Sequence, residues 1–239
     1  MVSVVFTPRW FYGIDCLFEG VAVIVALLIA FYSYKMYTFT KQGNHKFFSL
    51  SFLAIAIAFI CKIITNLSLV SSVVGAQEHI GFFMYGQHRI VLEHLLYVAG
   101  FLGHRLFMLL GLLGVYFVIH KYRAKKLVLL SAYLLTLVTV ITTFSVWAYP
   151  IFYVTSGILL LFIAQFYYDV YYGKREHKKN KNVKFLLYAF GILMVSQFAF
   201  TLIIGHLYFY VFAEALQLAG FLMLLFVYYK LVIRNKKKK

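Results

Sequence analysis

Acidic residues are scarce in this chain, and their scarcity excludes an ordinary soluble protein. Only 7 of the 239 residues are acidic, and charged residues of both signs make up 13% of the chain. Soluble domains carry about 25% charged residues, so a water-exposed surface of usual composition cannot be built from this sequence. The solvent must therefore be largely apolar.

Cysteine and proline are nearly absent, with two residues of each. Cys16 and Cys61 fall within or beside apolar runs, so neither a disulfide framework nor a cysteine-based zinc site is supported. Pro8 and Pro150 lie away from the centres of the apolar runs. The broken helices that form binding sites in many transporters are therefore not evident.

Apolar residues make up most of the chain, since 64% of it is hydrophobic. A bilayer core about 30 Å thick needs about 20 apolar residues per helical span, and the runs are continuous rather than alternating. The sequence therefore predicts an all-α integral membrane protein, a seven-transmembrane-helix bundle formed as a single domain by residues 1–239. The predicted spans are 14–37, 47–70, 91–120, 127–147, 151–172, 185–205 and 209–233.

Basic residues predict the orientation of these spans, because Lys and Arg accumulate in cytoplasmic loops. One side of the predicted bundle collects 19 of the 23 basic residues, including the tail 234–239. We therefore expect a multi-pass protein of the cell membrane with its N-terminus outside and its C-terminus cytoplasmic. The short basic loops suit anionic lipid headgroups at the cytoplasmic face, and they indicate no nucleic-acid partner.

Charged and polar residues inside the predicted spans are the candidates for function, because they are costly in a bilayer. They gather in the outer halves of the spans, where Asp15 and Glu19 also lie. Arg105 is the deepest, and we expect it to pair with Glu214 first and with Glu93 second. The candidate ligand-binding residues are Arg105, Glu214, Glu93, His104, Lys62, Gln217, Asn66 and Tyr97.

Helical spacing places several of these residues on common faces. Glu93, Tyr97, Gly100 and His104 form one stripe, and Lys62 shares a face with Asn66, as Glu214 does with Gln217. Gly100, Gly103 and Gly220 beside these stripes allow close helix approach or leave space for a ligand. Interhelical ion pairs that only fix the packing are the alternative interpretation of the same charges.

Metal and haem binding have little support in the pattern. His94 and His206 are the candidate metal ligands, but the sequence has neither an HExxH motif nor an ExxH pair. His94 and His104 lie on one helix about 15 Å apart along its axis, so they cannot hold one ion together. The sequence identifies no cofactor and no catalytic motif.

The pattern as a whole favours a receptor-like or sensor-like membrane protein with an outward-facing intramembrane pocket for a small ligand. One alternative is a structural or accessory subunit of a larger membrane complex, whose polar stripes face a membrane-protein partner or a second copy of the chain. Another is a transporter or a membrane metal or haem enzyme.

Overall fold

The computed structural model describes residues 8–11, 13–78, 86–120, 149–172, 181–204 and 206–236, together with 131, 136 and 138–140. Of the helix ends 69–78, 86–94 and 231–236, only the backbone is described. Within these residues the chain is helical and contains no strand. Six of the helices are long and apolar enough to cross a membrane, which confirms the predicted all-α membrane bundle.

The helices extend beyond several of the predicted apolar runs. The elements are η1 (Arg9–Phe11), α1 (Ile14–Thr40), α2 (Gly43–Glu78), α3 (Gly86–His120), α5 (Tyr149–Tyr172), α6 (Lys181–Thr201), η2 (Leu202–Ile204) and α7 (Tyr208–Lys236). The apolar runs underestimate α2 and α3 because a helix that leaves the hydrocarbon core keeps its internal hydrogen bonds in water. The predicted span 185–205 is corrected to 181–201, since its last turn tightens into η2. The predicted span 127–147 lies outside the described residues, apart from 131, 136 and 138–140.

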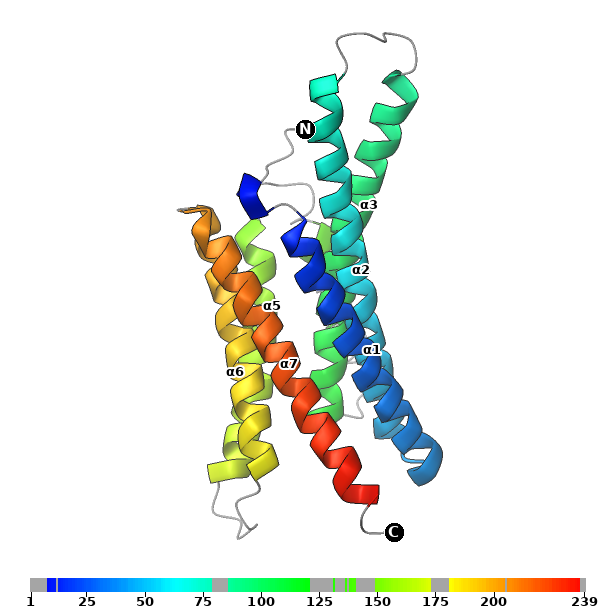
Figure 1. Cartoon of the computed structure of the whole chain (residues 1–239). Coiled ribbons are helices and arrows are strands. Elements are labelled where there is room, and N and C mark those ends of the chain that lie inside the picture. Colours follow the sequence, from blue (N-terminus) through cyan, green and yellow to red (C-terminus); the bar gives the residue numbers. More distant parts are fainter. Residues whose placement is uncertain are drawn as a thin grey trace.

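The six long helices form a closed ring. Each packs against the next in the order α1, α2, α3, α5, α6 and α7, and α7 packs against α1. Figure 1 shows this arrangement, with α7 crossing the front of the bundle beside α1. A ring of this kind has an interior into which every helix can direct one face.

Helix directions follow from the side chains that meet between neighbours. The ring of His104 lies near that of Phe152, and His120 lies near Phe166, so α3 and α5 run in the same direction. α5 therefore begins at the end of the bundle opposite to the one where α3 ends. A crossing by the predicted span 127–147 would connect the two. The first and last described helices consequently begin at the same end of the bundle, and α7 ends at the other (Figure 1).

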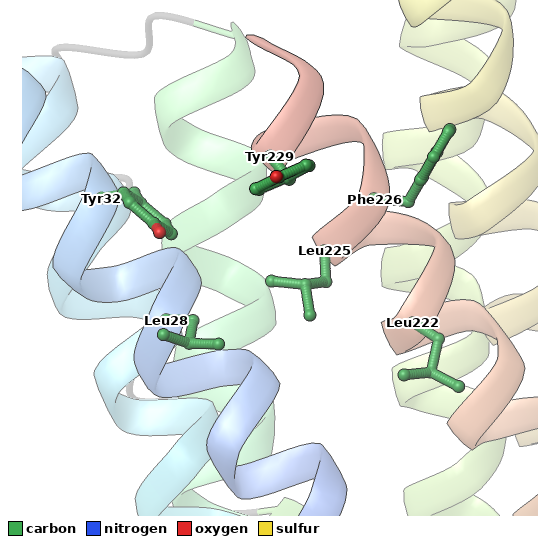
Figure 2. Close-up of a pocket in the computed structure, with 6 residues that line it drawn as sticks. All are labelled: Leu28, Tyr32, Leu222, Leu225, Phe226 and Tyr229. Atoms are coloured by element: carbon green, nitrogen blue, oxygen red, sulfur yellow. The ribbon is translucent and has the colours of Figure 1, made fainter. Parts of the chain in front are cut away.

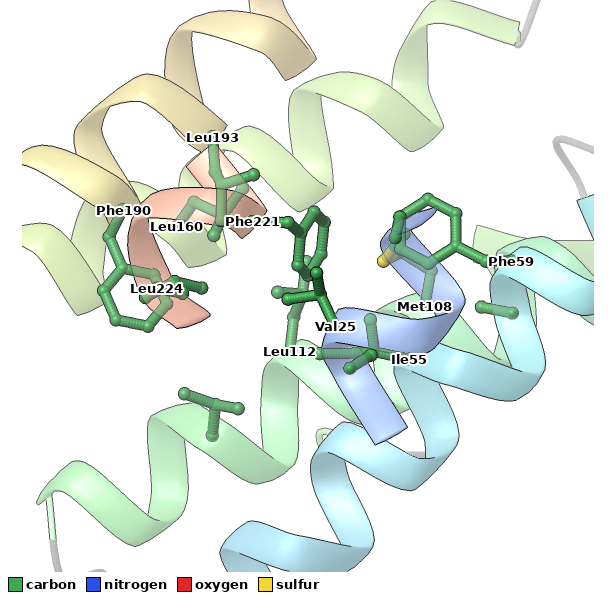
Figure 3. Close-up of a cluster of buried hydrophobic side chains, with 14 of the residues drawn as sticks. Val25, Ile55, Phe59, Met108, Leu112, Leu160, Phe190, Leu193, Phe221 and Leu224 are labelled. Atoms are coloured by element: carbon green, nitrogen blue, oxygen red, sulfur yellow. The ribbon is translucent and has the colours of Figure 1, made fainter. Parts of the chain in front are cut away.

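Apolar side chains fill the middle of the ring (Figure 3). Phe59 of α2 meets Phe221 of α7 edge to face, with the ring centroids 5.2 Å apart. The other four helices contribute buried residues around this pair, among them Val25, Leu112, Leu160 and Leu193. Large apolar side chains also point outward, which suits lipid contact; they include Leu17, Ile24, Phe31, Leu50, Phe162, Phe212 and Phe226.

Glycines bring α2 and α3 close together. A Cβ atom at Gly100 would lie 2.5 Å from Thr65 Oγ1 and 2.8 Å from the carbonyl oxygen of Cys61. Without an apolar driving force between helices in lipid, such close backbone approach is a main source of association. The close helix approach expected at Gly100 is therefore what the structure has, and this contact fixes the depth of the polar residues on both helices.

Candidate functional site

Three charged side chains from three helices meet inside the ring at the end where α1 begins. Lys62 of α2 places its Nζ atom 3.0 Å from Glu19 Oε1 on α1, and it also donates a hydrogen bond to Glu214 Oε1 on α7. Lys62, Glu19 and Glu214 are 8%, 1% and 2% exposed. We call these three residues the charge cluster.

The α2 helix supplies a second donor one turn after Lys62. Asn66 Nδ2 donates to Glu19 Oε1 at 2.9 Å, so this oxygen accepts hydrogen bonds from both an ammonium and an amide. The other carboxylate oxygen, Glu19 Oε2, is fully buried and has no hydrogen-bond partner among the described residues. A buried acceptor of this kind is costly unless something donates to it.

Aromatic rings surround the ammonium of the charge cluster. Lys62 Nζ lies 5.3 Å from the ring centroid of Phe200 on α6 and 5.8 Å from that of Tyr210 on α7. Each ring face attracts a cation, and both rings keep water away from the charge. The low dielectric that results strengthens the attraction between Lys62 and its two carboxylates.

The charge cluster contains two acidic side chains and one basic side chain. Two carboxylates share one ammonium, and the neighbouring acid Asp15 does not add to the ion pairs of Lys62. Asp15 Oδ1 instead accepts hydrogen bonds from the backbone N–H groups of Gly13 and Cys16, at 3.0 and 2.8 Å. This acid therefore accepts from two backbone N–H groups at the N-terminus of α1, where an acidic side chain in the first turn also suits the helix dipole.

The structure brings together some of the predicted site residues. Lys62, Asn66 and Glu214 meet in the cluster, and Gln217 is buried one turn beyond Glu214 with no partner for its Oε1 among the described residues. Glu19 was not selected as a candidate, although its carboxylate pairs with Lys62 and accepts from Asn66. Its depth in the first apolar run, similar to that of Lys62 in the second, was the signal that could have identified it.

The expected pairing of Arg105 with Glu214 is wrong. Glu214 contacts Lys62, while the guanidinium of Arg105 lies against aromatic rings, 3.9 Å from the centroid of Phe101 and 5.3 Å from that of Phe152. Arg105 is 1% exposed. Its planar guanidinium suits the faces of these rings at the α3–α5 contact, which accounts for the difference. The side chain of Glu93, its second expected partner, lies outside the described residues.

His104 and Tyr97 take structural positions beside Arg105. The Nδ1–H of His104 donates to the carbonyl oxygen of Ala58 at 3.0 Å, and the imidazole lies between the rings of Phe59 and Phe152. Because a carbonyl can only accept, this bond assigns the proton to Nδ1. Tyr97 stacks on Phe101, with the ring centroids 5.8 Å apart. Among the described residues, neither side chain forms a hydrogen bond or an ion pair with the charge cluster.

Only one of the two candidate metal ligands has a described side chain. His206 is exposed, and the side chain of His94 lies outside the described residues. In the part of the chain that the structure describes, no group of three or more His, Cys, Asp or Glu residues could hold a metal ion.

A groove of different character lies between α1 and α7 toward the other end of the bundle (Figure 2). Its lining is apolar apart from two tyrosine hydroxyls, and consists of Leu28, Tyr32, Leu222, Leu225, Phe226 and Tyr229. Leu222, Phe226 and Tyr229 are exposed on the outer surface of the ring, so the groove opens toward lipid.

Comparison of this chain with family models, with curated proteins and with solved structures finds no match. The function is therefore argued from the charge cluster and its position in the bundle.

Proposed function

We propose that this protein is a receptor-like or sensor-like module of the cell membrane, in which the charge cluster binds a small ligand and thereby changes the packing of α1 against α7. The observation that supports this proposal is the sharing of one ammonium by carboxylates on two other helices. The unpartnered Oε2 of Glu19 supports it further, since this buried oxygen can accept from a ligand.

A ligand that supplies positive charge or a hydrogen-bond donor suits this site. It would compensate the excess negative charge and would compete with Lys62 for the carboxylates. Lys62 holds α1 through Glu19 and α7 through Glu214, so a ligand that takes over either carboxylate weakens one of these two contacts. A buried ion pair of this kind acts as a two-state element, because its partners cannot separate gradually in a low dielectric.

The other end of the bundle would carry the response. α1 and α7 lie side by side and in the same direction from the charge cluster to the groove that Figure 2 shows. A small change of angle at the cluster therefore becomes a larger displacement at the far ends of these helices. With the predicted orientation, the ligand enters from outside and the displacement reaches the cytoplasmic face.

The test measures the distance between α1 and α7 at the far end. Spin labels at Tyr34→Cys and Tyr229→Cys, in a chain with Cys16 and Cys61 replaced by alanine, report this distance. We expect Glu214→Gln and Lys62→Met to shift or broaden the distance distribution, because each removes the ion pair between α2 and α7.

Asp169→Asn is the matched control, since it also removes one acid but lies exposed on α5. It should leave the distance distribution unchanged. If Lys62→Met fails to fold, Glu214→Gln tests the proposal by itself, because glutamine has nearly the same size as the glutamate it replaces. An unchanged distribution in a folded Glu214→Gln variant would show that the cluster is not coupled to the far end, and would overturn the proposal.

A further inference from the structure

The excess negative charge of the cluster points to the chemical identity of its ligand. We infer that the cluster binds one proton, carried by the carboxylate of Glu19, and that the proton is the ligand of the sensor proposed above. This inference rests on that proposed function and adds the ligand to it.

The acidic groups of the cluster outnumber its basic group. Glu19 and Glu214 are both within hydrogen-bonding reach of Lys62 Nζ, so two negative charges face one positive charge. An uncompensated charge within a bilayer costs several kcal/mol, and of these three groups only a carboxylate can remove the excess by gaining a proton. Hydronium transfers that proton: an O–H bond forms on the carboxylate, an O–H bond of hydronium breaks, and water leaves.

Glu19 Oε2 is the atom of the cluster at which the proton binds. Glu19 Oε1 already accepts from Lys62 and from Asn66, whereas Oε2 accepts nothing within the described chain. A proton can therefore bind at Oε2 without displacing Lys62 or Asn66 from Oε1, and by neutralising Glu19 it weakens the attraction between this carboxyl group and the Lys62 ammonium. Because Oε2 is fully buried, a proton reaches its bonding position without displacing side chains, which a larger cation would have to do.

Other titratable side chains also face the cluster. They are Asp15 and Cys16 on α1, His104 on α3, Tyr153 on α5 and Tyr210 on α7, while α6 contributes the apolar ring of Phe200. Asp15 Oδ1 already accepts from the backbone N–H groups of Gly13 and Cys16. A proton on His104 would add a second cation beside Lys62. Arg105 lies against Phe101 and Phe152, outside the ion pairs of Lys62.

The direct test is infrared difference spectroscopy of carboxyl groups in the full-length protein, purified in detergent and titrated with acid and base. We expect the wild type to show one protonated carboxyl group per chain at neutral pH, with a band that shifts in D₂O. Both Glu19→Gln and Glu214→Gln should lose this band, because either variant leaves one carboxylate facing one ammonium. Asp169→Asn should retain it.

A second measurement follows the melting temperature against pH. The folded wild type holds a proton that the unfolded chain releases at neutral pH, so its stability falls as pH rises through the titration of the cluster. Both glutamine variants should lose this decrease, and Asp169→Asn should keep it. If the wild type shows no protonated carboxyl group, or if the band persists in both glutamine variants, the inference is wrong.

The two proposals fail separately. Changed label distances in Glu214→Gln without a carboxyl band would mean that the cluster controls the helices but responds to another ligand. A carboxyl band without changed distances would mean that the cluster holds a proton but does not signal through α1 and α7.

Discussion

Helices α2 and α7 meet at both ends of the bundle, once through charges and once through aromatic rings. At the end where α1 begins, Lys62 binds Glu214, and at the other end Phe48 stacks on Tyr228 with the ring centroids 5.7 Å apart. The ring contact depends on shape and tolerates small displacements, whereas the ion pair depends on charge and on a fixed donor geometry. Only the charged end can therefore respond to a change of charge.

The contact between α5 and α6 follows the same division. Ser156 and Gln197 link α5 to α6 by a hydrogen bond of 2.8 Å in the polar half. In the other half, the same two helices meet through the stacked rings of Tyr167 and Phe190, 5.5 Å apart. Between α5 and α6, a polar contact thus selects the register at one end, and apolar packing fills the space at the other.

The largest effect we expect is an all-or-none difference in labelling between the two ends. In a chain without Cys16 and Cys61, cysteines at Thr40→Cys and Asn180→Cys should react with a membrane-impermeant maleimide only from the cytoplasmic side, because basic segments flank both positions. Labelling in intact and in opened cells provides the measurement. Reaction of either position from outside would reverse the orientation and place the charge cluster toward the cytoplasm.

Removing the ammonium should have the largest effect on stability. Lys62→Ala leaves two buried carboxylates facing each other, and we expect a loss of about 3–5 kcal/mol in the free energy of unfolding. The triple variant Lys62→Met, Glu19→Gln, Glu214→Gln contains no buried charge at this place and should recover part of the loss. Denaturant unfolding in detergent measures the free energy of unfolding of both variants. A Lys62→Ala variant as stable as the triple variant would contradict the ion-pair account.

A smaller loss of stability should follow when the contact between α2 and α3 is crowded. A Cβ atom at Gly111 would lie 2.6 Å from Ile55 Cγ1 and 2.9 Å from the carbonyl oxygen of Ser51. We expect Gly111→Ala to cost about 1–3 kcal/mol through overpacking, with no change in the pH dependence of melting. Gly191→Ala is the matched control, since a Cβ atom there meets nothing within 4 Å. Equal melting temperatures for the two variants would refute the close approach.

The smallest effect should come from the apolar end. Phe48→Leu removes the stacked pair with Tyr228 but leaves apolar bulk, so we expect a loss of about 0.5–1.5 kcal/mol. The pH dependence of melting and the infrared carboxyl band should match those of the wild type. If Phe48→Leu alters either of them, the two ends are not independent and the comparison between them fails.

Most of the fold could be predicted from the sequence because the bilayer imposes a simple rule on it. Apolar runs of sufficient length must be helical in lipid, and six of the seven predicted spans coincide with described helices. The helix ends were less predictable, as the extensions of α2 and α3 show, because helical hydrogen bonds continue after the apolar run ends. At Gly100 the sequence left two alternatives, close helix approach or space for a ligand, and the structure has the close approach.

The candidate site was only partly predictable. Lys62, Asn66, Glu214 and Gln217 stood out as polar residues within apolar runs, and the structure buries all but Asn66 below a tenth of their surface. The partners did not follow from the same pattern. Glu214 contacts Lys62 rather than Arg105, and Glu19 at the start of α1 proved to accept from two side chains of α2.

The sequence by itself determined that this chain is a helical membrane protein with its buried charged side chains toward one end of the bundle, because hydrocarbon thickness and the cost of buried charge act on each span separately. The tertiary structure alone decided which charges meet. Pairing depends on the order of helices around the ring and on the rotation of each helix about its axis, and both are set by packing between residues far apart in the sequence. The long stem of Lys62 reaches α1 and α7 together, whereas the guanidinium of Arg105 lies against the rings of α3 and α5.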